Sequence, residues 1–178
     1  MADDREVWKR ISRGDAEAFD GFYRANAPRL QSFLRQVTGN RQAAEDLAQE
    51  AFLQIWTRPN GFDPDRGKLR TYLFGVGRKR AAEWWRKQRP SEPAPEDKAE
   101  ASQTELHLMI EEALVKVSTE QRALLWLREV EGQSYDELAA ILEIPVGTVR
   151  SRLFAAREAL RKIWRTPRRN HGGQDELR

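Results

Sequence analysis

The stretch that decides the fold is SYDELAAILEIPVGTVRSRLFAAREALRKIW, residues 134–164. It opens on Ser134, and Glu137 follows three residues later. This is the spacing of a capping box, in which the hydroxyl and the carboxylate each bind a backbone amide at the start of a helix. Apolar residues recur at helical spacing as far as Leu142, and the short turn EIPVG, residues 143–147, follows. The pattern therefore predicts two helices that cross at a steep angle.

The second of these helices separates apolar from basic residues. Its apolar stripe recurs at alternating steps of four and three residues: Val149, Leu153, Ala156, Leu160 and Ile163. Outside the stripe lie Arg150, Ser151, Phe154, Arg157 and Arg161. A charged surface helix is one interpretation. A capped helix, a short turn and a basic second helix are, however, typical of a helix-turn-helix domain, whose second helix enters the DNA major groove.

Charge is unevenly distributed along the chain, although its net value is only +3. Residues 61–90 hold nine Lys or Arg against three acids, and residues 147–169 hold eight against Glu158 alone. Between these basic blocks, residues 91–121 hold eight acids and two Lys. The pattern indicates two surfaces that face a polyanion and a segment between them that avoids it.

Helical spacing also dominates the N-terminal half of the chain, and strand signals are nearly absent. We expect helices over residues 3–13, 16–37, 41–57 and 69–89, with a loop over residues 58–68 that holds two Pro and two Gly. Asp15 is the expected cap of the second helix, and Pro28 is expected to bend or break it.

The segment RPSEPAPEDKAEASQ, residues 89–103, has the composition of a mobile linker, because it holds three Pro, many acids and no large apolar residue. We therefore predict an all-α fold of two small helical domains joined by a flexible linker, the C-terminal one a helix-turn-helix domain. The expected bounds are 1–90 for the first domain, 91–105 for the linker, 106–165 for the second domain and 166–178 for a disordered tail.

Within the first domain, AEDLAQEAFLQIW, residues 44–56, places Asp46 and Glu50 one helical turn apart, with Gln49 beside them. Paired carboxylates can act as a general acid and base, but no nucleophile or metal partner accompanies them here. A solvated polar face and a protein-docking face remain the two interpretations.

The basic block that follows contains five aromatic residues, Phe62, Tyr72, Phe74, Trp84 and Trp85. Several have core spacing, yet interleaved rings and cations also suit single-stranded nucleic acid, whose bases stack on rings while Lys and Arg hold phosphates. The GVG of residues 75–77 lacks the third Gly of a dinucleotide fingerprint. It more readily allows the close approach of another helix or of a phosphate backbone.

Several classes of function are excluded by composition. The chain has no Cys, which removes disulfides and thiolate metal sites, and its two His, His107 and His171, are isolated. No apolar run approaches 18 residues and the N-terminus lacks a signal core, so we expect no membrane insertion and a cytoplasmic protein. We expect no metal, no cofactor and no catalytic residue.

Taken together, these segments resemble the bacterial RNA polymerase sigma factors of the extracytoplasmic-function (ECF) group, over roughly residues 5–165. AEDLAQEAFLQIW is similar to the family's core-polymerase-binding helix. FDPDRGKLRTYLFGVGRKRAAEWWRKQR is similar to its −10 reader, and SYDELAAILEIPVGTVRSRLFAAREAL to its −35 reader. The first domain would then be sigma region 2 and the second sigma region 4.

The resemblance implies three sets of site residues. Those for core polymerase, on its β′ clamp helices, are Asp46, Gln49, Glu50, Leu47, Phe52 and Trp56. Those for the −10 element, including a flipped-out base of the non-template strand, are Phe62, Asp63, Lys68, Arg70, Arg78, Lys79, Arg80 and Trp84. Those for the −35 duplex are Thr148, Arg150, Ser151, Phe154 and Arg157.

The resemblance further implies an alternative sigma factor that binds core polymerase at the β′ clamp helices and the β flap and opens promoter DNA. An anti-sigma factor would hold it in check. Two residues depart from common family residues, Lys79 in the −10 helix and Ala155 in the −35 helix, so the promoter sequence cannot be copied from relatives. The rival functions are a dimeric helix-turn-helix regulator and a DNA recombinase with a helix-turn-helix tail.

Overall fold

The computed structural model describes residues 4–58, 61–88 and 117–165. Every regular element in these ranges is helical: α1 (Asp4–Ser12), α2 (Ala16–Thr38), α3 (Arg41–Thr57), α4 (Leu69–Lys87), α6 (Thr119–Leu125), the π-helical turn η1 (Trp126–Val130), α7 (Tyr135–Leu142) and α8 (Val146–Arg165). The all-α prediction is confirmed. The linker expected over residues 91–105 and the tail expected over 166–178 lie outside the described residues.

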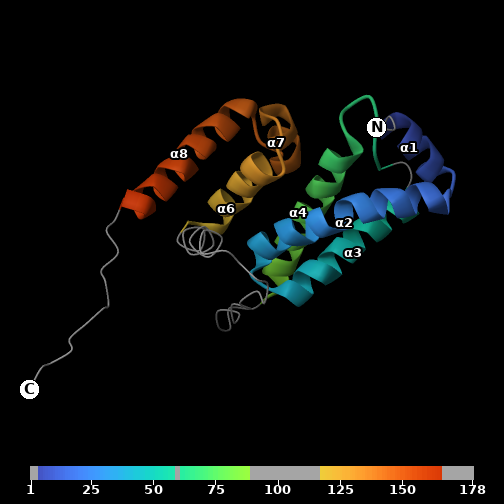
Figure 1. The fold of residues 1–178 in the computed structure, drawn as a ribbon, viewed down its shortest axis with the longest axis horizontal. Helices are drawn as coiled ribbons and strands as arrows, with labels where there is room; N and C mark the ends of the chain where they lie inside the picture. Colours follow the sequence, from blue (N-terminus) through green and yellow to red (C-terminus); the bar gives the residue numbers. More distant parts are fainter. Residues whose placement is uncertain (1–3, 59–60, 89–116, 166–178) are drawn as a thin grey trace, which may run out of the picture.

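Local capping signals set the ends of α2 and α3. The Asp15 carboxylate accepts hydrogen bonds from the backbone N–H groups of Glu17 and Ala18, which fixes the start of α2. Gly39 ends this helix at φ 67°, a left-handed conformation that favours glycine. Asn40 then caps α3 through the N–H of Ala43. These turns fold α3 back along α2, as Figure 1 shows.

Of the two outcomes expected at Pro28, a bend or a break, the break does not occur, because α2 continues through this residue to Thr38. Proline costs a helix one hydrogen bond and a clash with the preceding turn. Here the residues that follow it, Leu30, Phe33 and Leu34, are completely buried. Packing of this turn in the core outweighs the local cost.

The N-terminal unit, α1 to α4, has its core between α2, α3 and α4. Gly77 on α4 lies so close to α2 that a Cβ atom there would come within 2.8 Å of Leu30 Cδ1. The prediction of close helix approach at the GVG segment is therefore confirmed. At the other end of α2, an aromatic cluster of Phe19, Phe22 and Tyr23 packs on Phe52 of α3.

The C-terminal unit, α6 to α8, contains the predicted helix-turn-helix. The Ser134 hydroxyl accepts from the N–H of Glu137, and the Glu137 carboxylate accepts from the N–H of Ser134, so the capping box is present. The turn between α7 and α8 passes through Glu143, whose φ is 56°. Val149, Leu153 and Ala156 of α8 are buried as the apolar stripe predicts.

The two units pack against each other, α4 on α7 and α2 on α6, and their buried side chains form one continuous cluster. α4 and α7 come into contact at Gly75, where a Cβ atom would lie 4.0 Å from the Ile141 Cα atom, an ordinary van der Waals distance. In Figure 1, α8 lies on the side of the C-terminal unit remote from α3.

Candidate polymerase and nucleic-acid interfaces

The acidic face of α3 is exposed. Asp46, Gln49 and Glu50 all point to solvent, and Asp46 accepts a hydrogen bond of 3.0 Å from the Gln42 side-chain amide. Leu53, one turn beyond Glu50, shares this face and has 59% of its surface exposed. Sequence reasoning missed Leu53, although its spacing from Asp46 and Glu50 places it on the same side of the helix. The face thus combines carboxylates with one large apolar side chain.

Of the three apolar residues assigned to this face, two are buried and one is half-buried. Leu47 and Phe52 are 5% and 2% exposed, so the structure contradicts their assignment to a surface contact. Phe52 faces the aromatic cluster of α2, because the apolar stripe of α3 is used by its own core. Trp56 is half-buried, with its ring 4.9 Å from that of Phe19. Leu47 and Phe52 therefore hold α3 in place from the core, whereas Trp56 keeps part of its surface in solvent.

The loop of residues 58–68 is tied to α1 as well as to α4. Asp4 accepts from the N–H of Leu69 at 3.1 Å, and Arg5 pairs with Asp65 at 2.6 Å. Asp63 is exposed and folds the loop through a hydrogen bond from the N–H of Asp65. Loop residues 61–68 line a cavity of about 390 Å³ with α4, and Ile141 and Glu143 of the C-terminal unit close its other side.

Phe62, assigned to the −10 surface, is buried. Its ring contacts that of Trp8 edge-on and that of Tyr72 at a tilt, with centroids 5.3 Å and 5.4 Å away. With 9% of its surface exposed, Phe62 does not present an open surface on which a base could stack, which corrects the assignment. Phe62 instead forms a wall of the cavity beside Asp63 and Lys68.

The cations of α4 do not form a single surface. Arg78 and Lys79 point to α7, where Lys79 Nζ lies 2.7 Å and the Arg78 guanidinium 3.1 Å from the Glu143 carboxylate. Arg80 points the other way, donating to the Gln54 side chain at 2.9 Å and lying 3.9 Å from Glu50 of α3. Successive residues of a helix point in directions about 100° apart, so neighbouring cations in one turn of α4 can face α7 and α3.

Lys68 and Arg70 stand at the start of α4, and Trp84 near its end. Lys68 Nζ lies 2.9 Å from the Glu137 carboxylate of α7, whereas Arg70 is half-buried. Trp84 is half-buried, in edge contact with Trp85. Of the predicted −10 cations, Lys68, Arg78 and Lys79 thus already face carboxylates of the C-terminal unit.

These contacts lower the pKa values of two carboxyl groups, those of Glu137 and Glu143. Burial alone would raise the pKa of Glu137, but hydrogen bonds from Lys68 and from the Ser134 backbone bring it below its ordinary value. The hydrogen bond from Lys79 lowers the pKa of Glu143, which burial opposes and the charges of Lys79 and Arg78 reinforce. Both groups are therefore ionised while the two units are packed.

The exposed face of α8 carries most of the predicted −35 residues. Arg150, Ser151 and Phe154 are exposed, and Phe154 has 67% of its surface open to solvent. Thr148 lies half-buried at the helix start, and its carbonyl accepts from the Ser151 hydroxyl. Arg157 is held by Glu129 at 2.7 Å, and this hydrogen bond raises the pKa of the guanidinium. Because Arg150, Ser151 and Phe154 are all exposed, this face of α8 is accessible to a partner such as duplex DNA.

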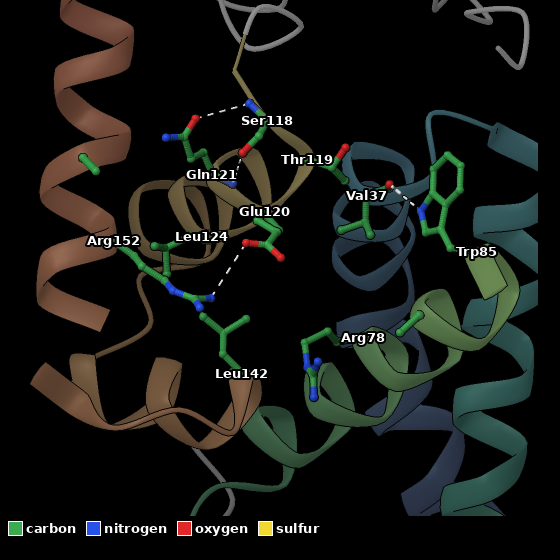
Figure 2. Close-up of a pocket in the computed structure, with 13 residues that line it drawn as sticks. Val37, Arg78, Trp85, Ser118, Thr119, Glu120, Gln121, Leu124, Leu142 and Arg152 are labelled. Atoms are coloured by element: carbon green, nitrogen blue, oxygen red, sulfur yellow. Dashed lines mark hydrogen bonds and ion pairs between the residues drawn. The ribbon is translucent and has the colours of Figure 1, made fainter. Parts of the chain in front are cut away.

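A groove of about 680 Å³ lies between the two units and is lined by residues of α2, α4, α6, α7 and α8. Figure 2 shows Trp85 at one side of it, donating to the Val37 carbonyl at 3.2 Å, and the Arg152–Glu120 ion pair at the other. Ala155 lines the groove, so this departure from common family residues stands beside Arg152 on the groove side of α8. The remaining lining includes Leu124 and Leu142, which make its walls largely apolar.

No group of three His, Asp or Glu suited to a metal ion occurs among the described residues. In the same part of the chain, no helix has the length and apolar character needed to span a bilayer.

Fold and surfaces together define a class of protein: a helical DNA-binding protein with an exposed helix-turn-helix and a second basic helix, α4, in a separate unit. The family models for Sigma-70 region 2 and Sigma-70 region 4 match residues 22–91 and 107–160. The sequence is 30% identical over 175 residues to the ECF RNA polymerase sigma factor RpoE of Cereibacter sphaeroides, covering 89% of this chain and 96% of the relative. It is also 30% identical to ECF sigma factor SigW of Bacillus subtilis, covering 86% and 92%.

Among solved structures, the sigma factor RpoE of Bartonella quintana, in complex with the anti-sigma factor NepR, is similar with a TM-score of 0.71. Its identity is 25%, and the match covers 86% of this chain and all of that one. The chain therefore belongs to the ECF sigma factors of bacterial RNA polymerase. It is a DNA-binding transcription initiation factor and not an enzyme, as the sequence predicts.

Proposed function

We propose that this sigma factor divides its work between three of the surfaces described above. Residues 1–90 are assigned to core-polymerase docking and −10 recognition, residues 91–105 to a linker, and residues 106–165 to −35 recognition. The observation that carries the proposal is that acidic α3 and basic α8 present opposite charges on opposite units. A protein that bridges polymerase and DNA needs this separation, because like-signed faces would compete for one partner.

The acidic face of α3 is the proposed docking site for the β′ clamp helices. Asp46, Gln49 and Glu50 supply polar contacts, and Leu53 supplies the apolar centre that protein interfaces require. Leu47 and Phe52 support this face from the core. The β flap is the proposed second contact with polymerase.

The −10 element is assigned to the cavity beside Asp63 and Lys68 and to the cations of α4, with Arg70, Arg78, Lys79, Arg80 and Trp84 along the strand. Holding a base that has left the stack converts binding energy into strand opening, since unstacking costs about a few kcal/mol. The factor therefore promotes melting without covalent chemistry.

The −35 duplex is assigned to the exposed face of α8. Arg150 and Phe154 face outward where base edges would lie, with Ser151 and Thr148 near the helix start, where phosphates bind. Joining both readers by a linker raises the effective concentration of the second to about millimolar once the first has bound.

An anti-sigma factor is the proposed inhibitor, with the groove of Figure 2 as its binding site. The largely apolar walls between the two units suit an amphipathic helix. Support comes from the similar Bartonella quintana RpoE, whose solved structure contains the anti-sigma factor NepR. We place the protein in the cytoplasm, where its polymerase acts.

Run-off transcription with core RNA polymerase, on the promoter of this protein's own operon, tests the function. The wild-type chain is expected to give a correctly initiated transcript, which Asp46→Ala combined with Glu50→Arg abolishes. Gln42→Ala, adjacent to Asp46 but outside the proposed contact set, serves as the control and should transcribe normally. A dimeric footprint on the promoter without polymerase, and no transcript, would instead indicate an ordinary helix-turn-helix regulator.

A further inference from the structure

The contact between the two units is organised by charge. Four ion pairs cross it: Arg29–Glu131 at 2.8 Å, Lys68–Glu137 at 2.9 Å, Arg78–Glu143 at 3.1 Å and Lys79–Glu143 at 2.7 Å. In each pair the cation belongs to the N-terminal unit and the carboxylate to the C-terminal unit. The pairs extend from the turn after η1, along α7, to the start of the turn before α8.

Backbone and hydroxyl groups strengthen this contact. Arg78 Nε donates to the carbonyl of Ile141 at 2.7 Å, in the last turn of α7, where the helix dipole favours a cation. The Thr71 hydroxyl of α4 lies 3.5 Å from the side-chain oxygens of both Gln133 and Glu137. These polar groups lie along the same contact of α4 and α7 as Gly75 and Ile141.

We infer that α7 and its flanking turns are an intramolecular latch that covers the −10 reader in the free protein. The inference rests on the proposed function, which assigns Lys68, Arg78 and Lys79 to promoter DNA. In the packed state the carboxylates of Glu137 and Glu143 form ion pairs with those cations, in the place that DNA phosphates would take. The first helix of the −35 reader thereby inhibits the −10 reader.

Geometry requires the latch to open for promoter binding. The −35 and −10 elements are some 25 base pairs apart, which at about 3.4 Å per base pair is about 85 Å of duplex. A protein in which α4 and α7 are in direct contact cannot read both elements at once. In Figure 1, α8 lies on the side of the C-terminal unit remote from α3, and its residues Arg150, Ser151 and Phe154 are exposed in the packed state. The packed state can therefore meet −35 DNA while the −10 reader remains covered.

The ion pairs of the latch are exposed enough for the two units to separate and pack again. Except for Glu131 and Glu137, whose side chains are 3% and 15% exposed, the paired groups keep a quarter or more of their surface in solvent. Partly exposed ion pairs are weak individually and are screened by salt. Docking on polymerase, or phosphates that compete for the same cations, can therefore separate the units.

The test measures the separation of the two units in the free chain. The chain has no Cys, so Gly21→Cys in α2 and Gly147→Cys in α8 create two unique positions for spin labels. A Cβ atom has nothing within 4 Å at either glycine. Pulsed electron–electron double resonance then gives the distance distribution between the labels in the absence of polymerase and DNA.

The latch variant combines Glu137→Gln with Glu143→Gln. Glutamine retains the capping hydrogen bond that Glu137 makes with the N–H of Ser134. The matched control combines Asp136→Asn with Glu158→Gln, which removes the same charge from the same unit; Glu158 pairs with Arg161 inside α8. Circular dichroism of each labelled protein establishes that it is folded.

At about 50 mM salt we expect one narrow distance distribution for the wild type and for the control. The latch variant is expected to raise the ratio of separated to packed chains about tenfold, the combined effect of several exposed ion pairs. Near 1 M salt, where the Debye length is about 3 Å, the wild-type distribution is expected to broaden toward that of the latch variant.

A second variant distinguishes the loss of these ion pairs from a general loss of folded structure. Glu143→Lys repels Arg78 and Lys79 and should separate the units, and adding Lys79→Glu should restore packing. A broad wild-type distribution at low salt, a latch variant identical to the control, or no restoration by Lys79→Glu would each overturn the latch. The proposed function is judged separately by run-off transcription, so its failure and the failure of the latch are distinguishable.

Discussion

The guanidinium of Arg29 on α2 holds the carboxylate of Glu131, 102 residues later in the chain, at 2.8 Å. The Glu131 side chain is only 3% exposed, so this carboxylate has been taken out of water into the contact between the two units. A buried charge is tolerated where its partner and geometry replace the lost hydration. The pair therefore joins sigma region 2 to region 4 in the free protein.

Arg29→Ala should loosen the C-terminal unit, because it leaves the Glu131 carboxylate buried without this partner. We expect a loss of about 1–3 kcal/mol in the packing of the units. Hydrogen exchange should show faster exchange in η1 and α6 with α3 unchanged. Arg24→Ala, which removes an exposed pair with Asp20 inside α2, is the control. Equal exchange in both variants would contradict the prediction.

Arg150→Ala should weaken promoter recognition without lowering stability, because Arg150 is exposed on the proposed DNA face of α8. A guanine contact by arginine contributes about 1–3 kcal/mol, so transcription should fall about tenfold to hundredfold on a limiting promoter. The comparison is Arg152→Ala, two residues along, whose side chain turns to Glu120 in the groove. Run-off transcription that is unaffected by Arg150→Ala, or equally affected by both changes, would refute the assignment.

Leu53→Asp should weaken binding to core polymerase at least about tenfold, because it places a charge at the apolar centre of the α3 face. Its thermal midpoint should remain near that of the wild type, since 59% of the Leu53 surface is already in solvent. Leu47→Ala should behave in the opposite way and lower the free energy of unfolding by about 2–5 kcal/mol. Fluorescence anisotropy with core polymerase and thermal unfolding separate the two effects. Undiminished binding by Leu53→Asp would exclude Leu53 from the interface.

Gly77→Val should lower the free energy of unfolding by about 1–3 kcal/mol, because even a Cβ atom there comes within 2.8 Å of Leu30. Gly21→Val makes the same exchange where nothing lies within 4 Å, and should change stability by only about 0.5 kcal/mol. Urea unfolding measures both. A Gly77→Val chain as stable as Gly21→Val would mean that α2 and α4 are further apart than described.

Acid should separate the two units. The pKa values of Glu137 and Glu143 are held below the ordinary 4.5 in the packed state, so packing binds fewer protons than separation does. Their contribution is complete above about pH 4.5 and is lost as the pH falls through the lowered values. The label distance in wild type should lengthen below pH 4.5, whereas Glu137→Gln with Glu143→Gln should show no transition there.

Local features of the fold could be predicted from sequence alone. Asp15 and the Ser134–Glu137 capping box set helix starts where expected, because each acts through hydrogen bonds to backbone only a few residues away. The stripe of Val149, Leu153 and Ala156 faces the core because helical periodicity determines which side of α8 is apolar. Motif order along the chain likewise indicated the sigma factor family, which the relatives confirm.

Placement of individual site residues could not be predicted in the same way. Phe62 and Leu53 are both apolar residues beside polar neighbours, yet Phe62 is enclosed by Trp8 and Tyr72 while Leu53 is exposed. Pro28 was expected to disturb α2, but burial of the following turn keeps the helix continuous. Whether a side chain is buried, and whether a helix continues through a proline, depends here on packing against residues distant in the sequence.

The sequence by itself determined the helices, their caps, the helix-turn-helix and the sign of charge on each segment, since all of these follow from near neighbours and helical period. Only the tertiary structure decided that α4 and α7 meet, and that the cations of the −10 reader face Glu137 and Glu143. The physical reason is that Gly75 and Ile141, 66 residues apart, must pack before any of these charges can pair. The same cations that the sequence assigns to DNA are therefore engaged within the protein first.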